Sequence, residues 1–97
     1  MARYVVLVQW TEQGVRNFAD TLDRASAAEE IAESTGGKMT EVYWTLGPYD
    51  IVAVFEADDD ESMTAAALKL SSGGNVRTTT MRAFGADEMR SILSKAG

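Results

Sequence analysis

The chain has 97 residues, of which 45% are hydrophobic and 25% charged, and these proportions predict one globular domain with a single core. Cysteine and histidine are both absent, which excludes disulfides and removes the thiolate nucleophile, the imidazole base and the preferred ligands of zinc and haem. The formal charge of −6 repels polyanions, and no apolar run approaches the roughly 18 residues needed to span a bilayer. We therefore expect a protein without a cofactor that binds neither nucleic acid nor membrane.

The amino-terminal part of the chain predicts a strand followed by helix. Residues 3–10 form a Val-rich apolar run of strand length, and no signal-peptide pattern precedes it, so we expect a cytoplasmic protein. From 12 to 34 apolar residues recur every three or four positions, which is typical of a helix. We expect a break near Asp20, whose carboxylate would accept from the amide of Asp23 as an N-cap. The glycine pair at 36–37 ends the helix.

The segment 46–50, Leu-Gly-Pro-Tyr-Asp, predicts a hairpin. Gly47 can adopt positive φ and Pro48 fixes φ without offering an N–H, so the pair is a two-residue turn signal between strands at 38–45 and 51–56. Tyr49 and Asp50 then stand at the start of the second strand, where polar groups often meet ligands.

A second helix is predicted after this hairpin, from the apolar spacing over 63–70. Asp58 with Glu61 three positions later resembles a capping box, so we expect Asp58 to cap this helix. A further glycine pair at 73–74 ends it. The acidic run that precedes the helix lacks the ligand spacing of a calcium loop, and we expect no metal there.

The carboxy-terminal part predicts one more strand and a short helix. Residues 75–84 are rich in β-branched side chains, which suits an exposed strand. The closing helix at 86–95 is expected to turn Met89, Ile92 and Leu93 inward.

The order β-α-β-β-α-β with a carboxy-terminal helix predicts a single ferredoxin-like α+β domain over residues 1–97. In this fold a four-stranded antiparallel sheet has the first and third strands at its centre, and two helices cover one face. Both faces of these central strands are apolar, which would leave a large exposed patch of the kind that interfaces use. We therefore expect a homodimer or larger homo-oligomer; the alternative is that the carboxy-terminal helix covers the second face.

Several segments together resemble the GYD-domain family. They are the glycine pair at 36–37, residues 46–47 with 49–52, and 74–78 leading to 82–84. The chain departs from the signature at Pro48, between the glycine and the tyrosine. The resemblance implies a ferredoxin-like fold, related to the dimeric α/β barrel proteins and to their assembly, and no established activity.

Five residues are candidates for ligand binding. Tyr49 and Asp50 form either a binding or proton-handling pair, or a turn in which Asp50 bonds backbone amides and Tyr49 packs. Trp10 and Trp44, with Tyr43 beside them, either line an apolar pocket between sheet and helices or pack in a core or interface.

Arg77 is the fifth candidate. It could bind a carboxylate or phosphate, or form a surface or intersubunit ion pair. Arg82, five positions later, should point to the opposite face of the strand.

Two functions remain open from the sequence. The favoured one is a non-catalytic, oligomeric small-molecule-binding or assembly module. The alternative is a cofactor-independent monooxygenase- or isomerase-like enzyme, in which Asp50 is the base, Tyr49 a hydrogen-bond donor and Arg77 the anion holder.

Overall fold

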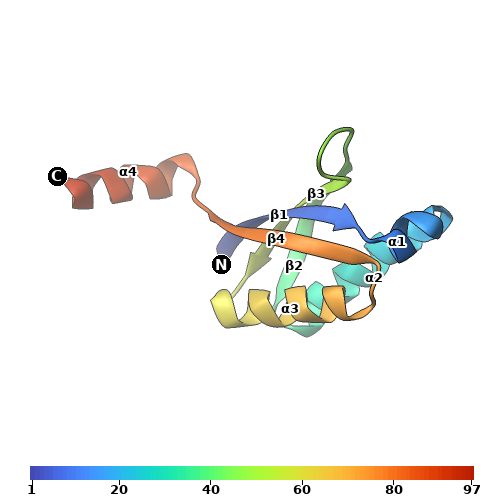
Figure 1. Cartoon of the computed structure of the whole chain (residues 1–97). Coiled ribbons are helices and arrows are strands. Elements are labelled where there is room, and N and C mark those ends of the chain that lie inside the picture. Colours follow the sequence, from blue (N-terminus) through green and yellow to red (C-terminus); the bar gives the residue numbers. More distant parts are fainter.

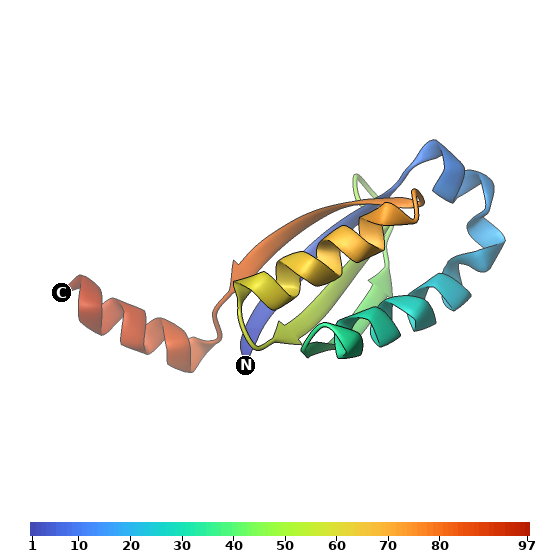
Figure 2. The ribbon, with the colours of Figure 1, turned by 90° about the horizontal axis from the view of Figure 1, so that it is seen from below.

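A four-stranded antiparallel sheet with helices on one face forms the body of the protein (Figures 1 and 2). The computed structural model describes all residues, Met1–Gly97. The elements in chain order are β1 (Ala2–Trp10), α1 (Glu12–Arg16), the 3₁₀ turn η1 (Phe18–Asp20), α2 (Thr21–Ser34), β2 (Gly37–Trp44), β3 (Ile51–Ala57), α3 (Asp60–Ser72), β4 (Val76–Ala83) and α4 (Ala86–Ala96). The strand order is β2-β3-β1-β4, so β1 and β3 are central and the ferredoxin-like fold is confirmed.

The core lies between the sheet and the helices α2 and α3. Strand register places Tyr4 opposite Phe55 and Val6 opposite Ala53, and alternation along the strands turns all four toward the helices. Ala32 of α2 and two residues of α3 complete a small buried cluster. Only 10 of the 97 residues are buried, so the single chain has a thin core.

The opposite face of the sheet is not covered by any helix, and we call it the open face (Figure 1). Its centre consists of apolar side chains from the two central strands, namely Val5, Leu7, Val52 and Val54. Tyr43 on β2 and Met81 on β4 flank this centre and are 57% and 43% exposed. The prediction that both faces of the central strands are apolar is confirmed.

Helix α4 projects beyond the edge of the sheet instead of crossing the open face (Figures 1 and 2). The radius of gyration is 14.4 Å, compared with about 12.5 Å for a compact chain of this length. Met89 and Leu93 are 43% and 59% exposed, so the prediction that they face inward is wrong. The contacts of α4 with the end of β4 are local: Arg82 pairs with Glu88 at 3.4 Å, and Glu88 accepts from the amide of Gly85 at 3.1 Å. No residue of α4 is buried.

The predicted helix starts need correction at single residues. The helical region does break at Asp20, but the Asp20 side chain makes no capping hydrogen bond, because its backbone continues from the 3₁₀ turn rather than from an extended residue. Helix α3 is capped by Asp59 and not by Asp58: the Asp59 carboxylate accepts from the amide of Ser62 at 2.8 Å. This hydrogen bond from the Ser62 amide is the main reason why the pKa of Asp59 lies below its ordinary value.

The connection between β2 and β3 is also longer than predicted. It spans residues 45–50 instead of a two-residue turn, with Gly47 at φ +132°. Thr45 donates its amide to the carbonyl of Asp50 at 2.9 Å, and its hydroxyl to the carbonyl of Tyr49 at 2.6 Å. These two bonds close the loop where a tighter turn was expected. None of the helices is long and apolar enough to cross a bilayer.

Candidate functional site

The Asp50 carboxylate holds the end of β1. Its Oδ2 atom accepts from the backbone amide of Trp10 at 2.8 Å. The Asp50 backbone amide donates to the carbonyl of Val8 at 2.9 Å, so side chain and main chain of Asp50 both bind the same strand. A carboxylate in this position replaces the ladder partner that β1 lacks beyond the end of β3.

Neither the cleft nor the hollow described below is lined by Tyr49, Asp50 or Arg77. Arg77 is exposed on the open face opposite Gln9 of β1 and takes part in no ion pair. Gln9 itself donates to the carbonyl of Pro48 at 3.1 Å and so lies between β4 and the loop 45–50. As predicted, Arg82 points to the other face, where its guanidinium lies 5.7 Å from the centre of the Tyr4 ring. The arrangement of base, donor and anion holder that the sequence suggested for Asp50, Tyr49 and Arg77 stays a prediction.

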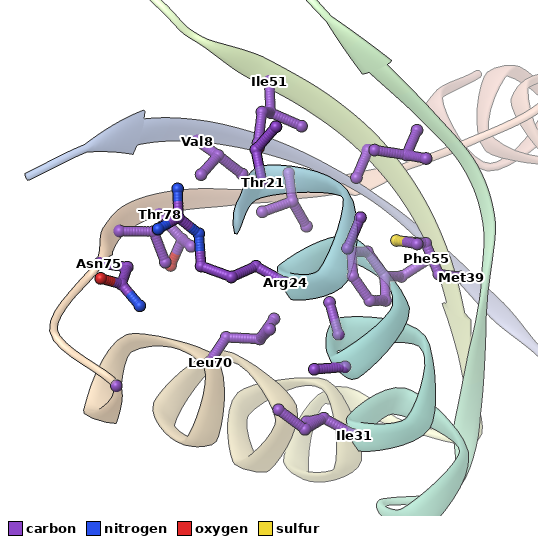
Figure 3. Close-up of a pocket in the computed structure, with 18 of the residues that line it drawn as sticks. Val8, Thr21, Arg24, Ile31, Met39, Ile51, Phe55, Leu70, Asn75 and Thr78 are labelled. Atoms are coloured by element: carbon purple, nitrogen blue, oxygen red, sulfur yellow. The ribbon is translucent and has the colours of Figure 1, made fainter. Parts of the chain in front are cut away.

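A cleft of about 220 Å³ lies between the helix-covered face of the sheet and the helices α2 and α3 (Figure 3). Of its 20 lining residues, 14 are hydrophobic, so its wall is mainly apolar. Trp10 is one of them. Trp44 does not line the cleft but donates its indole N–H to the hydroxyl of Thr21, a lining residue, at 2.9 Å. Tyr43 lies on the open face.

Small side chains on α2 keep this cleft from closing. Ala25, Ala27 and Ala28 all line it, and none is long enough to fill the space between α2 and the sheet. At one end the cleft is bounded by Asn75, in the connection between α3 and β4.

Close backbone packing fixes this end. The Asn75 carbonyl accepts from the amide of Thr11 at 3.0 Å, and its side-chain oxygen accepts from Gln13 at 2.9 Å. Gly14 packs directly against the same carbonyl: a Cβ atom there would lie 2.0 Å from the Asn75 oxygen. The α1 segment is thereby held against the start of β4.

Arg24 extends from α2 across this end of the cleft. Its Nη2 donates to the carbonyl of Gly14 at 3.1 Å, and its Nη1 to the carbonyl of Asn17 at 3.2 Å. Figure 3 shows its guanidinium on the same side of the cleft as Asn75 and Thr78, with Phe55 and Met39 on the opposite side. The cleft therefore has a polar end and an apolar end.

The electrostatics of the cleft are opposite to those of the whole chain. Arg24 and Lys69 are its only charged lining residues, and no aspartate or glutamate lines it, although the chain carries a net charge of −6. The indole N–H of Trp10 is buried and has no hydrogen-bond partner. Buried donors of this kind normally have a partner.

A second, more open hollow of about 460 Å³ lies beside α3 and contains Tyr4, Asp60 and Arg82. The Tyr4 hydroxyl donates to the Asp60 carboxylate at 2.5 Å. Burial, together with this hydrogen bond, raises the pKa of Tyr4 to about 12. Tyr4 therefore stays protonated at neutral pH and acts as a donor rather than as a base.

Sequence reasoning did not identify Arg24 or Lys69. A signal for Arg24 was present, because Arg24, Ala28 and Ile31 are spaced by four and three and so share the apolar side of α2. A cationic side chain on the apolar side of a helix is unusual, so Arg24 could have been singled out as a candidate binding residue. Lys69 has no comparable signal, since its contact with the cleft depends on how α3 lies relative to α2.

A profile of the GYD domain matches residues 4–93. The chain belongs to the GYD domain family. A relative of this GYD domain from Thermus thermophilus, named glutamine synthetase and cystathionine beta-lyase binding protein, is 33% identical over 85 residues. The match covers 87% of this chain and 90% of the relative. The resemblance described from the sequence is thus confirmed.

Solved structures agree on the fold of the GYD domain. The crystal structure of TTHA0845, also from Thermus thermophilus, is 28% identical with a TM-score of 0.58, and the match covers 89% of this chain and 96% of that one. The crystal structure of FFRP-DM1 has a TM-score of 0.62 at 17% identity, covering 87% of this chain and 100% of that one. At that identity the likeness shows the fold alone.

Proposed function

We propose that this GYD domain is a non-catalytic, homo-oligomeric binding module. Two copies pair through their open faces, and the helical side of each copy, with its cleft, stays available for other molecules. The observation that carries this proposal is the uncovered apolar centre of the sheet.

The open face has the composition of an interface. Val5, Leu7, Val52 and Val54 form a continuous apolar centre, since β1 and β3 are neighbours. Charged side chains lie around it: Arg77 on β4, and Lys38 with Glu56, which are 3.9 Å apart. An apolar core with a polar rim is typical of protein interfaces, and monomers rarely expose such a patch. Helix α4, the one element of this chain that could have covered the centre, points away from it.

A role in binding other proteins is supported by the relative from Thermus thermophilus, whose name describes it as a binding protein for two enzymes. The match to that relative extends over most of both chains. Co-sedimentation of this protein with purified glutamine synthetase and cystathionine beta-lyase from its own organism tests this part of the proposal. It would be refuted if the protein formed a complex with neither enzyme.

A catalytic role has less support from the geometry. Asp50 is engaged by the Trp10 amide, and Arg77 lies on the open face, away from the cleft. The cleft itself contains no carboxylate that could act as a base.

Sedimentation velocity at micromolar concentration tests the pairing. Leu7 lies at the centre of the open face, opposite Val52 and Thr79 on its two neighbouring strands. In Leu7→Glu, like charges from two copies would face each other in an apolar interface, so we expect this variant to sediment as a monomer. Leu68→Glu on α3, where the leucine is 69% exposed, is the matched control and should keep the oligomer. A parent protein that sediments only as a 10.5 kDa species would refute the proposal.

A further inference from the structure

We propose that the cleft between the sheet and the helices α2 and α3 binds a small organic anion, with a carboxylate on an apolar body. This inference rests on the proposed binding role of the cleft and is independent of self-association. It is carried by the charges that line the cleft and by their position at one end.

The charge of the lining selects for an anion. Both charged residues of the cleft, Arg24 and Lys69, are cationic. The two hydrogen bonds that Arg24 makes to the carbonyls of Gly14 and Asn17 leave other guanidinium N–H groups for a ligand. Lys69 is exposed and takes part in no ion pair, so its ammonium group is free at the mouth of the cleft.

The two ends of the cleft require a ligand of mixed character. The guanidinium of Arg24 lies beside Asn75 and Thr78, which provide further hydrogen-bonding groups (Figure 3). At the other end lie Phe55 and Met39, where a charged group would have no partner. A ligand that satisfies both ends carries its charge on one side and its hydrocarbon on the other.

Trp10 lines the cleft and can therefore report on binding there. Its indole N–H is buried without any acceptor, although an unsatisfied donor of this kind costs free energy. The NMR signal of this N–H offers a spectroscopic probe beside the cleft.

The size and chemistry of the cleft limit the ligand further. A volume of about 220 Å³ is below the roughly 300–1,000 Å³ of sites for drug-sized molecules, so the ligand is a small one. A carboxylate fits better than a phosphate, because the partly engaged guanidinium and one flexible ammonium group offer little for a dianion. Gly73, which lines the cleft, is not part of a phosphate loop either.

The test compares acids with their neutral amides. Phenylacetate and hexanoate are titrated into the protein, with phenylacetamide and hexanamide as matched neutral probes. Binding is followed by calorimetry and by the NMR signal of the Trp10 indole N–H, assigned with Trp10→Phe. We expect at least one of the two acids to bind at least tenfold more tightly than its amide and to shift the indole signal.

Charge reversal at the mouth of the cleft gives the second arm of the test. Lys69 is exposed, so Lys69→Glu should fold like the parent and weaken acid binding at least tenfold. Lys95→Glu on α4 reverses the same charge outside the cleft and should leave binding unchanged.

Three results would overturn the inference: equal affinity for acid and amide, no effect of Lys69→Glu, or no shift of the indole signal at millimolar acid. Sedimentation of the same samples tests self-association separately from anion binding. A monomeric parent that prefers the acids would refute self-association alone, whereas an oligomer that binds acid and amide equally would refute the anion inference alone.

Discussion

Replacing Asp50 distinguishes a structural role from a chemical one. In Asp50→Ala the partly buried amide of Trp10 loses the carboxylate that accepts from it at 2.8 Å. Hydrogen bonds to charged groups contribute about 1.5–3 kcal/mol, so we expect the free energy of unfolding to fall by about 2 kcal/mol. Asp50→Asn keeps an acceptor oxygen but loses the charge, and we expect a loss of about 1 kcal/mol.

Urea unfolding followed by circular dichroism measures this effect. With a slope of about 2 kcal/mol per molar urea, the midpoint of Asp50→Ala should fall by about 1 M. Parent and variants must be compared at one protein concentration, because association would add to the apparent stability. The control is Asp58→Ala, which removes an exposed aspartate whose side chain makes no hydrogen bond. A parent-like midpoint for Asp50→Ala, or an equal shift in the control, would refute the structural role and leave Asp50 free for chemistry.

Two further predictions concern packing and pH. Gly14→Ala should destabilise the protein by about 1–3 kcal/mol in urea unfolding, because its Cβ would lie 2.0 Å from the Asn75 oxygen; Gly73→Ala, with no contact shorter than 3.8 Å, is the control and should be neutral or stabilising. The pKa of Tyr4 is raised to about 12, so its contribution to stability should be complete below about pH 10 and be lost as pH rises through 12. In a tyrosinate absorbance titration Asp60→Asn should lower this pKa, and an unchanged midpoint would contradict the role of that hydrogen bond.

The alternation of side chains made much of the fold predictable. Val5 and Leu7 on one face of β1, with Val6 and Val8 on the other, indicated a central strand with two apolar sides, and the structure places β1 there. Such patterns are local consequences of strand geometry, so they can be read from a single sequence.

Details that depend on distant contacts could not be predicted in the same way. Asp58 and Asp59 are equally good capping residues by type. Which of them caps α3 depends on where β3 ends, and its last paired residue is Ala57, opposite Ala2 and Gly37. The cleft was missed for the same reason, because Lys69 and Arg24 belong to different helices and their relation is set by packing.

Helix α4 differs from the rest of the chain in how it should unfold. Isolated helices shorter than about 12–15 residues are marginally stable in water, and α4 spans Ala86–Ala96 without a buried residue. Its opening therefore exposes almost no core, so α4 is not part of the cooperative unit formed by the sheet with α2 and α3. We expect the amide hydrogens of α4 to exchange rapidly while its apolar side chains are uncovered. Slow exchange there would indicate that another surface covers them.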